Sequence, residues 1–182
     1  MKSITSIVAL FVGLVAVAPL SVHAGSTVRS HELEAQAQKT VHAFEKNDPS
    51  LAALFRNSHG YVVFPKIGKG GAIIGGARGK GLVYEKGAVI GEASLTQVTV
   101  GLVLGGETFS QVIFFENQKA LARFKENRLE FAAQATATAV NAGSGAQHQF
   151  DNGMAVYTMA RKGAMGEAAI GGQKFHYTPN AS

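Results

Sequence analysis

The 182-residue chain contains no cysteine, and this absence excludes several kinds of chemistry at once. Disulfide bonds, thiolate nucleophiles, haem attachment and lipid modification of a cysteine all require this residue. The hydrophobic core must therefore be stable without cross-links. Negative charge is also scarce, because 12 Asp and Glu oppose 17 Lys and Arg, which gives a formal net charge of +5.

The first 24 residues are expected to be a secretory signal peptide. A short basic start is followed by an apolar run over 7–18, and residues 22–24 resemble an A-x-A cleavage site. The apolar run ends at Pro19, short of the about 20 apolar residues that a membrane-spanning helix needs. We therefore expect an exported protein, periplasmic or extracellular, peripheral on a membrane, that begins at Gly25 after cleavage.

An N-terminal helical segment is predicted over 25–57. Apolar residues recur at helical spacing between Ser26 and Asn47. Asp48-Pro49 then predicts an N-cap and a first helical residue, so a second helix should follow and end near Asn57. Both helices should form one globular unit with the remaining residues, 58–182.

The pattern changes to short β segments from Gly60 onward. The first is expected to end at Pro65, and Lys86-Gly87 is expected to be a turn. In the clearest strand, 95–104, Val98 lies on the apolar face and Gln97 on the opposite face. The other predicted strands are 61–64, 71–77, 82–85, 88–90 and 109–115.

The C-terminal part is predicted to add one internal helix, capped by Asn117, and a closing pair of strands over 154–160 and 164–177. The segment 129–141 fits a helix or a strand, and 143–145 is expected to be a loop. Glycines inside strands favour sharp sheet curvature. The predicted fold class is α+β, with N-terminal helices packed on a strongly curved, mainly antiparallel, glycine-rich sheet or sandwich.

Positive charge is concentrated in one glycine-rich part of the chain. Between residues 56 and 86 the only acid is Glu85. Such a field favours anionic partners, namely phospholipid headgroups, anionic glycans or nucleic acid, although a soluble surface with a positive bias gives the same count. The six basic residues are Arg56, Lys66, Lys69, Arg78, Lys80 and Lys86.

Motifs for phosphate-cradling loops and metal sites are incomplete. A P-loop built on Gly79-Lys80 would require a glycine at Ile74 and a hydroxyl at Gly81, and a dinucleotide fingerprint would require a glycine at Ile73. His31 begins H-E-x-x-H, but the second histidine is replaced by Ala35. We therefore expect no catalytic or metal-binding residues, no cofactor, no nucleotide and no nucleic acid.

Several short motifs follow one another in a characteristic order between Ser58 and Tyr177, and together they resemble the SYLF domain family. The motifs are Gly60–Pro65, Gly70–Ala77, Gly79–Val83, Thr99–Val103, Phe114-Phe115 before the Asn117 helix, Gly153–Tyr157 and Gly171-Gly172. The resemblance implies a compact α+β domain without catalysis that binds membrane lipids through a basic surface and an N-terminal helix. Some members of that family also bind actin filaments.

Two principal hypotheses follow. The first is an exported, non-enzymatic SYLF-type domain that binds anionic phospholipid through Arg56, Lys66, Lys69, Arg78, Lys80 and Lys86. The second is an envelope or host-directed module that binds another protein, in the manner of an actin-binding domain. An unrecognised hydrolase is a third possibility that the motifs do not support.

Overall fold

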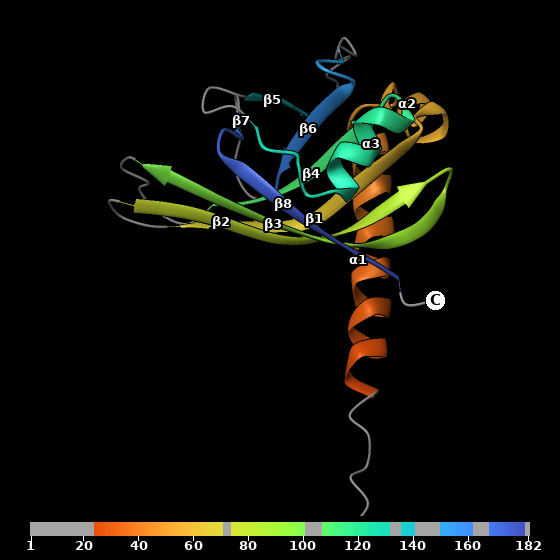
Figure 1. Cartoon of the computed structure of the whole chain (residues 1–182), viewed down its shortest axis with the longest axis horizontal. Helices are drawn as coiled ribbons and strands as arrows, with labels where there is room; N and C mark the ends of the chain where they lie inside the picture. The colour runs from red at the N-terminus through yellow and green to blue at the C-terminus, as the bar shows by residue number, and fades with distance from the viewer. Residues whose placement is uncertain are drawn as a thin grey trace, which may run out of the picture.

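The computed structural model describes residues 24–70, 74–100, 107–131, 136–140, 150–161 and 168–180. Three helices lie in these ranges: α1 (Ala24–Asn47), α2 (Leu51–Asn57) and α3 (Gln118–Lys125). The strands are β1 (Gly60–Gly70), β2 (Ile74–Glu85), β3 (Ala88–Val100), β4 (Glu107–Phe115), β5 (Thr136–Ala139), β6 (Met154–Ala160), β7 (Ala168–Ala169) and β8 (Gln173–Pro179). Hydrogen bonds join them in the order β7-β5-β6-β4-β1-β2-β3-β8 (Figure 1).

This sheet is antiparallel except where β5 runs parallel to β6, and α1 packs against it. The predicted α+β class with a mainly antiparallel sheet is confirmed. The predicted closing pair of strands is wrong, because β6 pairs with β4 while β8 lies at the other side beside β3. The intervening chain contains β7, so the connection is long enough to carry β8 across the sheet.

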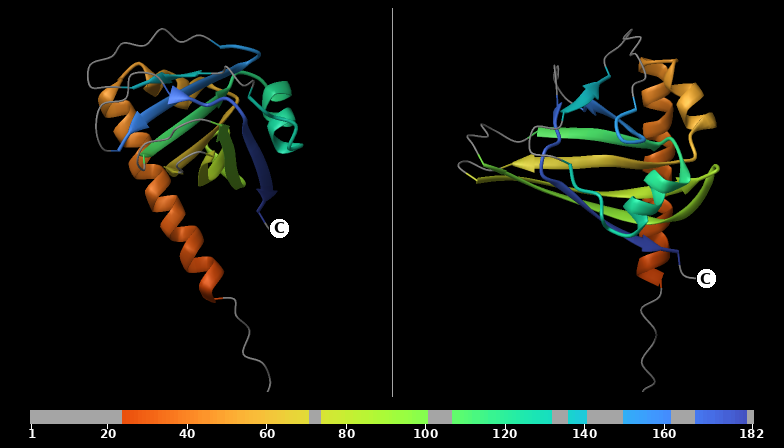
Figure 2. Two further views of the ribbon diagram at one scale, coloured as in Figure 1. Left: turned by 90° about the vertical axis from the view of Figure 1, so that its left-hand side faces the viewer. Right: turned by 45° about the horizontal axis from the view of Figure 1, so that its top comes forward.

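The sheet is strongly curved, as its glycine content predicts. Three strands separate β4 from β8, so in a flat sheet these two strands would lie about 19 Å apart. Instead the Gln111 Nε2 of β4 donates a hydrogen bond of 2.9 Å to Gln173 Oε1 of β8. The concave inner face therefore encloses a core, which α3 covers through Leu121 and Phe124 (Figure 2).

The convex outer face packs against α1 and α2. Phe44 of α1 and Leu51 and Leu54 of α2 are buried in a cluster with strand residues. Beneath them the rings of Tyr61 and Tyr84 are stacked 4.7 Å apart. Burial raises the pKa of Tyr84 to about 12, with Tyr61 and Glu34 acting in the same direction. The N-terminal part of α1 extends beyond the edge of the sheet (Figure 2).

The two predicted N-terminal helices are present, but the second begins later than its sequence signal. Asp48 and Pro49 form a turn, in which the Asp48 carboxylate accepts hydrogen bonds from the backbone and hydroxyl of Ser50. The helix α2 then begins at Leu51 and ends at Asn57. Asp48 thus stabilises the turn instead of capping the helix directly. The predicted cap of α3 is confirmed, since Asn117 Oδ1 accepts from Ala120 N at 3.0 Å.

Pro65 does not end the first strand, contrary to the prediction. β1 continues to Gly70, and a β-bulge accommodates the proline: Val63 pairs with Leu82, whereas Lys66 pairs with Lys80. β1 thus advances three residues while β2 advances two. An extra residue reverses the subsequent alternation, so Lys66 lies on the same outer face as Val63.

The direction of the alternation in β3 also differs from its sequence pattern. Gln97 is buried on the inner face and donates to the Gly171 carbonyl at 2.9 Å, while Val98 is 69% exposed on the outer face. A buried amide is tolerated because it is hydrogen-bonded, and Gln173 Nε2 also donates to Gln97 Oε1. The other interrupted β segments merge into β2 and β3, around the predicted Lys86-Gly87 turn. Residues 1–23, 71–73, 101–106 and 143–145 lie outside the described residues.

We predict that Gly81→Ala lowers the free energy of unfolding by about 1–3 kcal/mol, because overpacking forces the backbone to shift. A Cβ at Gly81 would lie 2.5 Å from the Val63 carbonyl oxygen in β1. The control is Gly68→Ala in β1, where an added Cβ has no atom within 4 Å. Urea denaturation measures both variants, and equal stability of the two would contradict the close approach of β1 and β2.

Candidate basic surface

Three of the six basic residues singled out from the sequence share the outer face of the sheet. Lys66 of β1 lies directly opposite Lys80 of β2, and Arg78 of β2 lies opposite Gly68. Residues paired in register point to the same side of a sheet, and all three cations are exposed. This is the face against which α1 packs. The three cations lie outside the buried cluster that α1 and α2 cover.

The last strand extends this surface by two residues that sequence reasoning missed. In β3 and β8, Thr96 pairs with Lys174 and Ser94 with His176. Because Thr96 and Ser94 pair in turn with Arg78 and Lys80, rows of side chains cross four strands. The alternation of residues in β8 indicates that Lys174 points outward. The sequence does not indicate that β8 pairs with β3, because this pairing depends on the tertiary fold.

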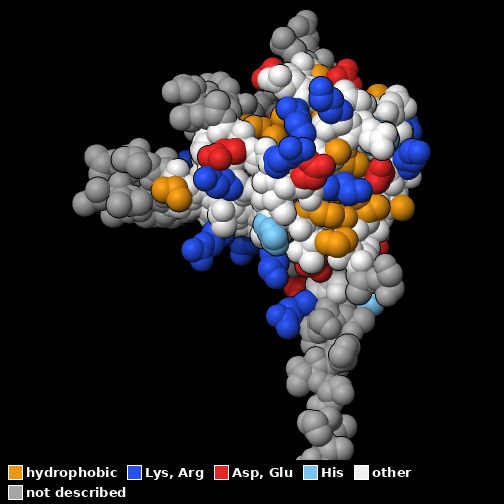
Figure 3. All heavy atoms as spheres, viewed as in Figure 1, with side chains coloured by type: hydrophobic (Ala, Val, Ile, Leu, Met, Phe, Trp, Pro, Cys, Tyr) orange, Lys and Arg blue, Asp and Glu red, His pale blue; other side chains and the backbone are white. Residues whose placement is uncertain are grey.

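We call Lys66, Arg78, Lys80 and Lys174 the basic face. Lys and Arg side chains gather along the lower side of the strands, beside a histidine (Figure 3). Lys174 Nζ lies 3.5 Å from Glu130 Oε2, and both side chains are more than half exposed. That ion pair is screened by water and lowers the positive field only modestly. The exposed Val98 is on the same face, two residues beyond Thr96 in β3.

The other three predicted residues lie elsewhere. Lys69 is on the inner side of β1, opposite Glu107 of β4, and is partly buried. Arg56 is in the last turn of α2. Lys86 is in the turn between β2 and β3, at the opposite end of that hairpin from Arg78, and has φ of 50°. The six residues therefore do not form one continuous surface.

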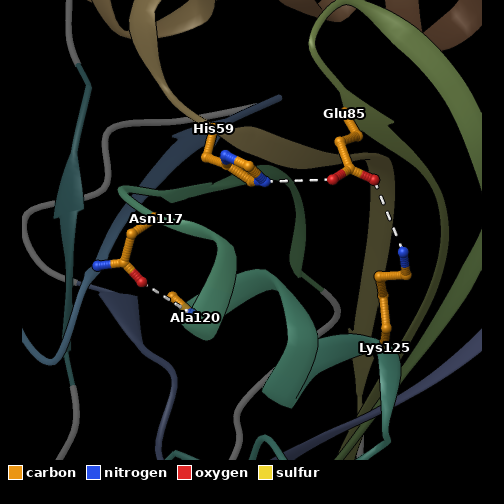
Figure 4. A network of polar contacts seen from close by, with 5 residues as sticks. All are labelled: His59, Glu85, Asn117, Ala120 and Lys125. Carbon is orange, nitrogen blue, oxygen red and sulfur yellow. Dashed lines mark hydrogen bonds and ion pairs between the residues drawn. The ribbon is translucent and has the colours of Figure 1, made fainter.

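A separate polar network joins the start of β1, the end of β2 and α3 (Figure 4). His59 Nε2 lies 3.1 Å from Glu85 Oε1, and Lys125 Nζ lies 3.6 Å from Glu85 Oε2. Both pairs are partly exposed, and together they tie α3 to the β1–β2 end. His59 is thus held by a polar contact with the Glu85 carboxylate.

The described residues contain no group of three or more His, Cys, Asp or Glu side chains placed to hold a metal ion. No helix in the described ranges has the length and apolar character needed to cross a bilayer.

Comparison with known families finds a match in the C-terminal half of the chain. Residues 96–181 match the family model Ysc84, described as a Las17-binding protein actin regulator. The matched region runs from within β3 to just beyond the end of β8, so it includes Lys174 but begins after Lys66, Arg78 and Lys80. No curated protein matches the chain.

We predict that Lys80→Gln raises the free energy of unfolding by about 0.2–1 kcal/mol at low salt, because like charges directly opposite on neighbouring strands repel. The gain should disappear in 1 M salt, where charges are screened beyond about 3 Å. Lys86→Gln is the control, since Lys86 lies in a turn without a cation paired opposite it. A loss of stability in Lys80→Gln at low salt would contradict the arrangement.

Proposed function

Residues 96–181 belong to the Ysc84 (SYLF) domain family, and on this premise we propose that the domain binds anionic membrane lipid through its basic face. The observation that carries the proposal is the register of β1, β2, β3 and β8, which brings Lys66, Arg78, Lys80 and Lys174 to one exposed surface. The proposed role is binding without catalysis. It is performed by the exported chain that begins at Gly25, which N-terminal sequencing of the secreted protein would verify.

The energetics favour a membrane surface as the ligand of this face. Each Lys or Arg close to anionic lipid contributes about 1 kcal/mol, so four residues acting together provide a useful attachment that weakens with salt. The exposed Val98 supplies an apolar contact on the same side of the sheet.

The six basic residues predicted from the sequence have different roles in this proposal. Lys66, Arg78 and Lys80 can approach a bilayer together, and Lys174 joins them. Lys69 lies on the opposite side of β1, so it does not reach the same plane. Arg56 and Lys86 contribute to the overall positive field, which steers the protein toward an anionic surface.

We predict that Arg78→Glu/Lys80→Glu weakens binding to anionic vesicles about thirtyfold or more, from the loss of two favourable contacts of about 1 kcal/mol each. Co-sedimentation of the Gly25–Ser182 chain with phosphatidylglycerol-containing and with neutral phosphatidylcholine vesicles measures the effect. The wild type should bind the first and release it at high salt.

The matched control is Lys119→Glu/Arg128→Glu, which changes the net charge equally on exposed residues at α3, across the sheet from the basic face. It should retain most of the binding. Equal losses in the two double variants would show that net charge alone matters, and equal binding of wild type to neutral vesicles would contradict the proposal.

A second candidate function is binding of a protein. The matching family, described as a Las17-binding protein actin regulator, favours this alternative. An acidic protein surface satisfies the same cations as an anionic bilayer does. Sedimentation with filamentous actin, without sedimentation with anionic vesicles, would support the protein partner and contradict the lipid.

A further inference from the structure

A groove of about 490 Å³ lies between α1 and the outer face of the sheet. Pro65 and Ser110 line its strand side, Lys39 and Thr40 line its α1 side, and Met159 lies at the end of β6. The β-bulge shapes it, because Ser110 Oγ donates a hydrogen bond of 2.7 Å to the Pro65 carbonyl and holds the extra residue in place.

Three cations from three separate elements line this groove: Lys39 of α1, Lys66 of β1 and Arg161 immediately after β6. Neither Asp nor Glu is among its lining residues. A second groove at α1 carries negative charge, since Glu34 and Glu92 line it. Of these two grooves at α1, the one beside Pro65 is lined by cations without an acid.

Few neutral hydrogen-bond donors remain in the groove for a ligand. The Ser110 hydroxyl donates to Pro65, and the Thr40 hydroxyl donates to the Gln36 carbonyl at 2.8 Å. The Gln36 amide donates to Glu32 at 3.1 Å. Apart from the second amide hydrogen of Gln36, the remaining side-chain donors are the two ammonium groups and the guanidinium, which favours an anion over a neutral polar ligand.

We propose that this groove binds a phosphate group, free or as a terminal phosphomonoester. A guanidinium binds two phosphate oxygens with its planar fork, and two lysines add point charges from other directions. A phosphomonoester carries about two negative charges, enough to offset most of the charge of three cations. The lipid form of this inference rests on the function proposed above, and the free-phosphate form does not.

The first test uses inorganic phosphate and the Gly25–Ser182 chain. Phosphate should raise the melting temperature in a saturable manner, beyond chloride at equal ionic strength. Lys39→Gln/Arg161→Gln should weaken the phosphate Kd at least about tenfold, the effect of losing one charge-assisted contact or more. Lys119→Gln/Arg128→Gln, with the same change of net charge, should leave the Kd unchanged.

An increase that matches chloride, or that survives in Lys39→Gln/Arg161→Gln, overturns the inference. A variant that melts much lower than wild type without phosphate is replaced by Lys39→Gln alone, whose side chain is exposed on α1. That single substitution should still weaken the phosphate Kd, and an unchanged Kd counts against the site.

The second test distinguishes the two sources of the phosphate group. Vesicles containing phosphatidic acid present a phosphomonoester, and vesicles containing phosphatidylglycerol at matched surface charge present only a phosphodiester. A lipid-headgroup site predicts tighter binding to phosphatidic acid, and Lys39→Gln/Arg161→Gln should abolish this preference while retaining binding to phosphatidylglycerol through Arg78, Lys80 and Lys174. Saturable binding of inorganic phosphate without vesicle binding would support a free phosphate ligand and contradict only the membrane function. Vesicle binding without a phosphate effect would contradict only the groove.

Discussion

The outer face of the sheet depends on the β-bulge in β1, where Ser110 of β4 donates to the Pro65 carbonyl. The extra residue changes the register on both sides of β1. Without it, the alternation from Val63 would direct Lys66 toward the aromatic core, where an unpaired ammonium is strongly unfavourable. With it, Lys66 lies beside Lys80 at the junction of the basic face and the α1 groove. A single local irregularity therefore determines on which side of the sheet Lys66 lies.

The two sides of the sheet have different roles for a physical reason. The inner side closes on itself, and its polar centre is occupied by the amides of Gln97, Gln111 and Gln173, which hydrogen-bond to one another. These side chains satisfy buried groups and leave the enclosed space to the core. The outer side is covered by α1 over only part of its area. The part of the outer side that α1 leaves uncovered carries the exposed cations of the basic face.

The pairing of Lys66 with Lys80 in the basic face lowers the stability of the fold and favours the proposed binding of an anion. Lys66 and Lys80 lie directly opposite each other on neighbouring strands, so their like charges repel. A protein selected only for stability would separate these two residues or place an acidic residue beside them. An anionic surface or a phosphate group bound there, as proposed, would relieve that repulsion. The same principle explains why Lys174, which has Glu130 within 3.5 Å, contributes less to the unbalanced charge than Lys66 or Arg78. The proposed binding and its expected salt dependence therefore rest on one electrostatic arrangement.

The sequence by itself determined the helix periodicity of α1, the cap at Asn117, the Lys86-Gly87 turn and the need for a curved, mainly antiparallel sheet, because these depend on neighbouring residues and on glycine content. It also identified Lys66, Arg78 and Lys80 as candidates. Only the tertiary structure decided that Lys69 lies on the other side, that Gln97 is buried, and that β8 brings Lys174 beside β3. Alternation along one strand gives relative sides, but strand order, register and bulges depend on contacts between residues distant in the chain. These long-range contacts determine which of the cations share one surface.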